Sequence, residues 1–454
     1  MRSILRLGIL SAIALGALPS LGRAQQGLYL PGGGAAHVSM GGASTATPVD
    51  AIGALYWNPA AIGRLGRSEA AIGGAFLFPE IGLESSAPGR RSGRTRSDSG
   101  AGVASSLGMV YQPDDQPLTF GMGLMTLGGG GVNFPGDTTN PILSGVGPLR
   151  NVQGPISSSL TLAQMTPTIA YRATERLVFG FGPTVSIAVA SFDPAFFGPP
   201  DDANGDGIGT FPTGAHSRPF WGGGLRAGVV YSVTDRLDVG FGYTSPQWFE
   251  KWKYHARNEL GAPRTLFLNA TLPAIYSWGV AYRPIDRLLL AVDLRYFDYT
   301  NTDLFGTPLR DGGLGWRGVF AAAIGGRFQA TERAALSAGY IYNDNPIPSV
   351  GTLFNVQGPA INQHTIATGL TTKVTDSLSM SLGYAYGFRN TLSGPIREAT
   401  GTGVKISAET HQLTFAMQIR FGGGVRKAAV GPPACDPPAP APAAGTAPAP
   451  ATGG

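Results

Sequence analysis

The sequence predicts an all-β fold, a 14-stranded antiparallel transmembrane β-barrel with an N-terminal plug inside its lumen. Three observations carry this prediction: the balance of charge and hydropathy, a hairpin unit that recurs six times, and a segment without alternation ahead of the first strand. Only 13% of the 454 residues are charged, 68 are Gly, and the mean hydropathy is +0.06. Strands that face lipid on one side and a lumen on the other average to such a middle value, whereas helical membrane proteins are far more hydrophobic.

The first 24 residues are typical of a cleavable signal peptide. Arg2 and Arg6 form a basic start, residues 7–21 are largely apolar, and Gly22-Arg23-Ala24 places small residues before the cleavage point. An uncleaved anchor is the alternative, and the short apolar run argues against it. We therefore expect the mature chain in the outer membrane of a Gram-negative-type bacterium.

The repeated unit is an alternating strand, a short polar turn and a second alternating strand. Each turn is too short to connect parallel strands, so each joins an antiparallel pair. One strand before the first long loop (67–78) and one at the end (407–421) bring the predicted total to fourteen. An even number closes the barrel with both termini in the periplasm and leaves no free sheet edge in lipid. The six turns lie at residues 111–117, 171–177, 231–237, 282–288, 328–334 and 373–378.

Period-2 alternation gives each strand one apolar face. After the last turn, Leu378, Met380 and Leu382 lie opposite small polar residues and glycines. Long connections separate the hairpins, which predicts extracellular loops opposite short periplasmic turns. These loops are expected at residues 79–100, 128–156, 191–218, 247–268, 300–315, 344–362 and 389–406.

The predicted domains are a signal peptide (1–24), a plug (25–66), the barrel (67–421) and a periplasmic tail (422–454). The last strand ends at Phe421, which resembles the signal read by the outer-membrane assembly machinery. The tail is rich in Pro and Ala and is expected to be extended and disordered. It holds the single cysteine, Cys435, so no intramolecular disulfide is expected.

Basic residues gather at Arg90, Arg91, Arg94 and Arg96 in a Gly/Ser-rich stretch. The stretch favours a solvated loop, and contact with anionic outer-membrane lipid or lipopolysaccharide head groups is the alternative. No nucleic-acid partner is predicted.

Residues 25–66 do not alternate, and their small residues and short apolar runs suit a compact plug. They include Met40-Gly-Gly-Ala-Ser-Thr-Ala46, then Asp50, then Asn58, Pro59 and Ala60. At these residues the sequence resembles the FadL/TodX family of outer-membrane transporters for long-chain fatty acids and other hydrophobic compounds. Two further stretches look like family strand and loop starts: residues 268–273, opening the eighth strand, and 343–348, just after the eleventh.

The resemblance implies passive, selective uptake of hydrophobic molecules. The ligand would land among the long outer loops, pass to a lumenal pocket and leave through a lateral gap at a kink in the third strand. That strand, residues 118–127, runs into four glycines that weaken ladder pairing, namely Gly128, Gly129, Gly130 and Gly131. A non-selective porin or a surface adhesin is the alternative function.

Aromatic residues in the predicted loops are candidate ligand contacts, with an aromatic girdle at the membrane rim as the alternative. These residues are Phe192, Phe196, Phe197, Phe211, Trp248, Phe249 and Trp252. Arg317 looks like the family's basic residue for a carboxylate. The second basic residue of fatty-acid members has no counterpart in residues 186–192, which leaves neutral hydrocarbons and aromatics open. The alternative is that Arg226, Arg295 and Arg317 pair with Asp238 and Asp293.

One loop resembles a calcium site, because Asp202, Asn204 and Asp206 occupy positions 1, 3 and 5 and Gly207 follows. Position 12, which needs Glu, is Thr213, so a solvated loop with Asx turns is favoured. The five histidines are isolated, and no nucleophile elbow or P-loop is present. The sequence therefore predicts no enzyme and no cofactor.

Overall fold

The computed structural model describes residues 26–89, 92–144, 154–216, 218–396 and 400–422. The predicted signal peptide, Arg90, Arg91, nearly all of the tail and Cys435 lie outside these residues.

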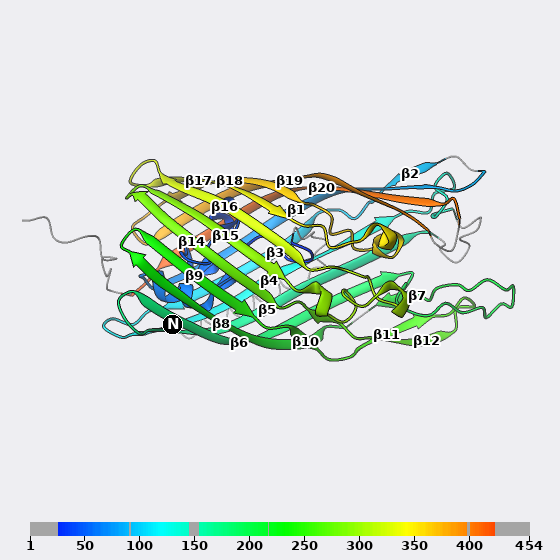
Figure 1. The fold of residues 1–454 in the computed structure, drawn as a ribbon, viewed down its shortest axis with the longest axis horizontal. Helices are drawn as coiled ribbons and strands as arrows, with labels where there is room; N and C mark the ends of the chain where they lie inside the picture. The colour runs from blue at the N-terminus through cyan, green and yellow to red at the C-terminus, as the bar shows by residue number, and fades with distance from the viewer. Residues whose placement is uncertain (1–25, 90–91, 145–153, 217, 397–399, 423–454) are drawn as a thin grey trace, which may run out of the picture.

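Long antiparallel strands close into a barrel of fourteen, as predicted (Figure 1). The first strand pairs with the last from Glu69–Arg420 to Ser86–Gly403, so the sheet has no free edge along this seam. The strands are β1 (Glu69–Ser86), β3 (Gly102–Tyr111), β4 (Leu118–Phe134), β5 (Ile156–Arg172), β6 (Leu177–Asp193), β8 (Phe220–Thr234), β9 (Leu237–Thr244), β14 (Ile275–Ile285), β15 (Leu288–Phe297), β16 (Val319–Gln329), β17 (Ala334–Asn343), β18 (His364–Lys373), β19 (Leu378–Pro395) and β20 (Gly403–Arg420).

Short turns lie at one end of the barrel, the turn end, and long connections lie at the other, the loop end. The six predicted turns are confirmed. In four of them a Thr hydroxyl accepts backbone hydrogen bonds; Thr174 Oγ1, for example, accepts from the N–H groups of Arg176 and Leu177 at 3.2 and 3.0 Å. Shorter elements lie in the long connections: β2 (Gly93–Arg96), β7 (Thr213–His216), β10 (Gln247–Phe249), β11 (Trp252–Arg257), β12 (Pro263–Leu268), β13 (Thr271–Leu272), η2 (Tyr299–Asn301), η3 (Leu309–Asp311), η4 (Ser349–Gly351) and η5 (Leu353–Asn355).

Four strands, β1, β4, β19 and β20, are longer than the sequence pattern indicates. The ladder between β1 and β20 continues past Phe78 through Glu80 and Glu84, and β19 continues to Pro395. Strand β4 likewise extends through the four glycines to Phe134. Backbone pairing needs no apolar face, so strands outlast the apolar alternation by which they were predicted.

Apolar side chains cover the outside of the wall. Leu413, Phe415 and Ile419 of β20 are among the exposed large hydrophobic residues, and residues on the opposite face of the strand point inward. No helix in the described part of the chain is long and apolar enough to cross a membrane.

Residues 26–66, called the N-terminal segment below, are almost entirely buried and lie inside the barrel (Figure 1). The segment contains α2 (Ala35–Ser39), α3 (Ala51–Tyr56) and η1 (Pro59–Arg64). Helix α2 contacts β17 to β20 and β1, α3 contacts β1, β3 and β4, and η1 contacts β4, β5, β6 and β8. The segment therefore touches the wall on several sides.

Candidate functional site

Asn58 makes hydrogen bonds both within the N-terminal segment and to the barrel wall. Its Nδ2 donates to Thr45 O at 2.8 Å and to Val229 O of β8 at 3.1 Å, and its Oδ1 accepts from Ala60 N at 3.0 Å. Asn58 thereby caps η1, which Pro59 begins. The motif of Asn58, Pro59 and Ala60 is thus a structural element of the segment in this fold.

Charged residues of the wall hold the same segment. Asp293 of β15 accepts from the backbone N–H groups of Ser44 and Thr45 at 3.0 and 3.1 Å. Arg295 donates to Asp293 at 2.6 Å and lies 4.2 Å above the Trp57 ring.

A second arginine caps a helix of the segment. Arg226 of β8 donates to Leu55 O and Tyr56 O at 2.6 and 2.5 Å, and so satisfies carbonyls at the C-terminus of α3. Of the predicted pairs, Arg295 with Asp293 is therefore present, whereas Arg226 binds carbonyls. Asp238 pairs with Arg64 and Arg283 at 3.2 and 3.1 Å.

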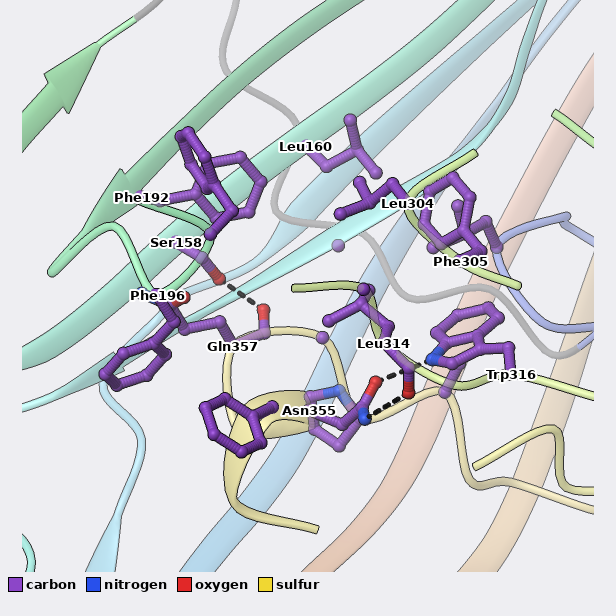
Figure 2. A pocket seen from close by; sticks show the side chains of 18 of the residues that line it. Ser158, Leu160, Phe192, Phe196, Leu304, Phe305, Leu314, Trp316, Asn355 and Gln357 are labelled. Carbon is purple, nitrogen blue, oxygen red and sulfur yellow. Dashed lines mark hydrogen bonds between the residues drawn. The ribbon is translucent and has the colours of Figure 1, made fainter. Parts of the chain in front are cut away.

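An apolar pocket lies toward the loop end (Figure 2). Its empty volume is about 1070 Å³, part of which is open to solvent. Among the described residues that line it, none carries a charge. The walls come from the N-terminal segment, from β4, β5, β6, β11 and β12, and from the connections before β7, β16 and β18.

The polar side chains labelled in Figure 2 are bonded to other parts of the wall. Asn355 Oδ1 accepts from Trp316 Nε1 at 2.6 Å, and its Nδ2 donates to Leu314 O and Gly351 O. Ser158 donates to Gln357 O, and Gln357 Nε2 donates to Pro194 O at 2.7 Å. These groups hold the wall together and leave its surface apolar.

The predicted loop aromatics divide into three groups. Phe192, Phe196, Phe197 and Trp252 line the pocket. Two others support it from behind, since Phe211 packs edge-on against Phe196 at 5.2 Å and Phe249 against Trp252 at 5.8 Å between ring centroids. Trp248 is 57% exposed and does not line the pocket.

Arg317 also lies away from the pocket. The Arg317 side chain is exposed, and its backbone N–H donates to Pro346 O at 2.9 Å. The preceding residue, Trp316, lines the pocket instead. Sequence reasoning missed the wall formed by Leu304, Phe305, Leu314, Trp316 and Phe354, although this density of apolar residues in two predicted loops was a usable signal.

The glycines of β4 lie at a discontinuity in the barrel wall. Pairing of β3 with β4 ends at Ser106–Met125, although β3 itself starts at Gly102. The β4–β5 ladder shifts register at Leu127, and Gly129 has φ 139°, a conformation that residues with a side chain rarely adopt. Gly129, Gly130 and Gly131 line the pocket.

The N-terminal segment takes the place of β3 there. Leu30 N donates to Leu127 O at 2.7 Å, and Gly129 N donates to Leu28 O at 3.2 Å. A Cβ at Gly128 would collide with Leu28 O, so this close approach requires glycine. The free edge of β4 is thus covered by residues that belong to the lumen.

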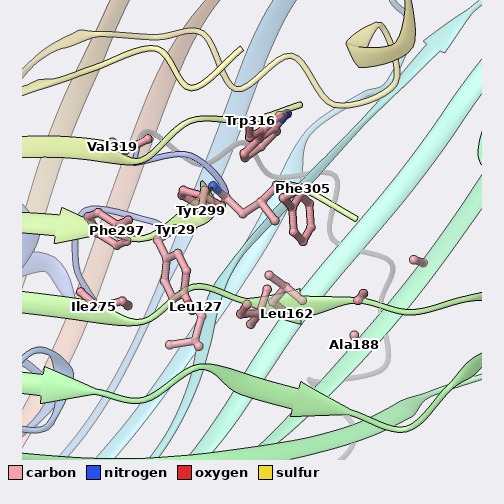
Figure 3. Packing of buried hydrophobic residues seen from close by; sticks show 14 of the residues in the cluster. Tyr29, Leu127, Leu162, Ala188, Ile275, Phe297, Tyr299, Phe305, Trp316 and Val319 are labelled. Carbon is pink, nitrogen blue, oxygen red and sulfur yellow. Dashed lines mark hydrogen bonds between the residues drawn. The ribbon is translucent and has the colours of Figure 1, made fainter. Parts of the chain in front are cut away.

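A column of aromatic rings joins the pocket to the N-terminal segment (Figure 3). Trp316 packs on Tyr299 at 5.0 Å, Tyr299 on Phe297 at 6.4 Å and Phe297 on Tyr29 at 5.5 Å. Tyr299 Oη also accepts from Leu28 N at 2.8 Å. The N-terminal segment is therefore in direct packing contact with the wall of the pocket.

The calcium-like loop closes on itself. Asp202, Asn204 and Asp206 each accept a backbone N–H from two to five residues ahead, at 3.0, 2.9 and 2.8 Å. The contacts of Asn204 and Asp206, each two residues ahead, are Asx turns, whereas the contact of Asp202 spans five residues. Within the described residues, no cluster of three or more His, Cys, Asp or Glu side chains could hold a metal ion.

One Ser–His pair exists inside the N-terminal segment. Ser44 Oγ lies 2.8 Å from His37 Nε2, but both residues are at most 1% exposed. Burial lowers the pKa of His37 to about 4, so the ring is neutral at physiological pH. A substrate could not reach this pair in the observed packing.

The family model for outer membrane transport proteins (OMPP1/FadL/TodX) matches residues 26–422. The chain belongs to this family. Its fold is that of outer-membrane transporters for hydrophobic compounds, which are channels rather than enzymes. No curated protein matches the sequence.

Solved structures of the same fold agree with this assignment. The toluene transporter TodX of P. putida superposes with a TM-score of 0.64 at 18% identity, over 87% of this chain and 100% of that one. A FadL homologue of Pseudomonas aeruginosa gives 0.65 at 16% identity, over 87% and 100%. The toluene transporter TbuX of Ralstonia pickettii gives 0.64 at 15% identity, over 87% and 99%.

Proposed function

We propose that this protein takes up uncharged hydrophobic molecules passively and selectively across the outer membrane. The observation that carries the proposal is the pocket, whose described lining contains no charged side chain. A buried carboxylate without a cation or several donors would be strongly penalised, whereas a neutral ring or chain would gain from burial. Two solved relatives are described as toluene transporters, which fits the same class of ligand.

The N-terminal segment is proposed to act as the plug. It is anchored by Asp293, Arg226 and Asn58, and it lies inside the barrel, so an open aqueous channel is the less favoured function. A porin conducts ions steadily in a planar bilayer, and a plugged transporter is nearly silent. Steady conductance of the wild-type protein would support the porin alternative.

The exit is proposed to be lateral, between β3 and β4. Support comes from the early end of their pairing at Ser106–Met125 and from the three glycines that border the pocket at this point. A network of buried polar side chains lies further along the lumen, where Gln247 Oε1 accepts from Thr184 and Gln164 at 2.6 and 3.1 Å. An apolar ligand would lose free energy by crossing such a network, which favours the wall route.

The test compares toluene with benzoate, which share a ring and differ in charge. We expect the purified full-length protein to bind toluene and to bind benzoate at least tenfold more weakly, by equilibrium dialysis. Arg317→Ala should leave both affinities unchanged, because Arg317 lies outside the pocket. Tighter binding of benzoate, lost in Arg317→Ala, would overturn the neutral-ligand proposal in favour of a carboxylate.

A further inference from the structure

Two aromatic side chains at the outer wall of the pocket have polar atoms without a partner. Trp252 is 2% exposed and Tyr254 is 0% exposed, and neither Trp252 Nε1 nor Tyr254 Oη makes a hydrogen bond. Both belong to β11, two residues apart on the same face of the strand. A buried donor without an acceptor costs about 1–3 kcal/mol, so such groups are rare and call for an explanation.

The surroundings of both groups are almost wholly apolar. Trp252 stacks on Phe220 at 5.0 Å with an interplanar angle of 6°, and Phe249 stands edge-on to it. Tyr254 packs against Phe192, Phe197 and Phe220 at 5.2 to 6.3 Å. Burial raises the pKa of Tyr254 well above its usual value, so its hydroxyl remains an O–H donor at any working pH.

Trp252 differs from Tyr254 in its access to the pocket. Trp252 lines it directly, whereas Tyr254 lies behind Phe192 and Phe197, which line it. A molecule in the pocket therefore meets the Trp252 side chain itself, and because Nε1 is buried in the observed packing, a hydrogen bond to it requires the surrounding rings to shift.

We infer that the pocket selects hydrophobic molecules that carry one uncharged acceptor oxygen, such as a ketone, ether or ester, and that Trp252 Nε1 donates to this oxygen. This inference rests on the proposed function and narrows its substrate class. Asn355 and Gln357, also in the lining, already bond to the protein, so Trp252 offers an N–H that a ligand can use. A single neutral oxygen suits a donor of this kind, because no cation in the described lining would balance a charge.

The test uses two ligands of the same skeleton, diphenylmethane and benzophenone, which differ by a CH₂ or C=O group. Binding of each to the detergent-solubilised full-length protein is measured by equilibrium dialysis. We expect the preference for benzophenone over diphenylmethane to be about tenfold smaller in Trp252→Phe than in the wild type. The affinity ratio of the two ligands is compared between the variant and the wild type. Because the hydration of each free ligand is the same in both measurements, it does not affect this comparison.

Trp248→Phe is the matched control, because Trp248 lies four residues away and is 57% exposed outside the pocket. It should keep the wild-type ratio. Equal weakening of both ligands by Trp252→Phe, or loss of the ratio in Tyr254→Phe alone, would overturn the assignment to Trp252. In those cases diphenylmethane still binds the wild type and the proposed function stands, whereas failure of both ligands and toluene to bind would overturn that function itself.

Discussion

The carboxylate of Asp293 accepts a hydrogen bond of 2.7 Å from the hydroxyl of Thr45, 248 residues earlier in the chain. The same oxygen, Oδ2, also accepts from two backbone N–H groups and from Arg295. One side chain of the wall therefore concentrates the polar contacts that hold a turn of the N-terminal segment. Such a concentration makes the position of the segment sensitive to a single substitution.

Asp293→Asn should loosen the N-terminal segment and raise ion conductance. The substitution removes the negative charge that balances buried Arg295, and breaking a buried ion pair costs about 3–5 kcal/mol. We expect frequent channel openings in planar bilayers, where the plug proposal predicts a nearly silent wild type. Asp286→Asn is the control, because Asp286 lies in an exposed turn with 86% of its side chain accessible. Silent Asp293→Asn channels would show that other contacts suffice to hold the segment.

Inward-facing glycines leave room for the N-terminal segment. A Cβ at Gly121 would lie 2.8 Å from Leu55 and one at Gly279 would lie 2.6 Å from Thr45, and a Cβ at Gly325 would collide with Met40 O. Gly326, the residue after Gly325, faces the opposite side of the strand. The nearest atom to a Cβ added at Gly326 would lie 3.5 Å away.

Gly325→Val should therefore destabilise the protein by about 1–3 kcal/mol, as overpacking does. It should also expose residues 26–66 to protease. Gly326→Val should change stability by less than about 0.5 kcal/mol, because it adds a side chain on the open face. Thermal unfolding in detergent and limited proteolysis provide the two measurements. Equal effects of both substitutions would mean that the wall adapts freely around the segment.

Asp50 and His37, two buried titratable groups of the N-terminal segment, should have opposite effects on the free energy of unfolding between pH 4 and 6. Burial, with Glu69 nearby, raises the pKa of Asp50 from 3.8 to about 6, so its folded form keeps a proton that the unfolded form loses. Stability from this group falls as the pH rises through that window. Burial lowers the pKa of His37 from 6.5 to about 4, so stability from His37 falls as the pH drops through the same range.

Single substitutions should separate these contributions. Asp50→Asn leaves only His37, so the free energy of unfolding should rise between pH 4 and 6. His37→Gln leaves only Asp50, and the free energy should fall over the same range. Guanidinium chloride unfolding in detergent at several pH values measures both slopes. Parallel slopes in the two variants would contradict the opposed burial effects.

Asn355→Ala should weaken ligand binding by opening the loop wall of the pocket. It leaves Trp316 Nε1 unpaired and frees Leu314 O, and an unpaired buried donor costs about 1–3 kcal/mol. We expect toluene to bind about tenfold more weakly, with the barrel strands intact by circular dichroism. Asn301→Ala is the control, since Asn301 is exposed and its Nδ2 donates to Asp298 in the same loop. Unchanged toluene affinity would show that the wall is held by other contacts.

Much of the fold was predictable because its signals are local. The two-residue alternation of a strand depends on residues close in sequence, and so do the hydrogen bonds of a turn such as Thr174 to Leu177. The six turns and fourteen strands could therefore be counted directly from the sequence. Strand ends were less predictable, because backbone pairing continues through polar residues such as Glu80 and Glu84. Four of the loop aromatics in the predicted set line the pocket, because apolar rings in a polar loop need a place of burial.

The class of fold, the strand count and the alternation that separates an outer face from an inner one follow from the order of the residues alone. Three relationships appear only once the chain is folded: Arg317 lies outside the pocket while Trp316 lines it, pairing with β4 passes from β3 to Leu28 and Leu30, and Asp293 contacts Thr45. The reason is the range of the interactions. Alternation is set between adjacent residues, whereas a pocket without charge arises only when segments hundreds of residues apart close around the same space.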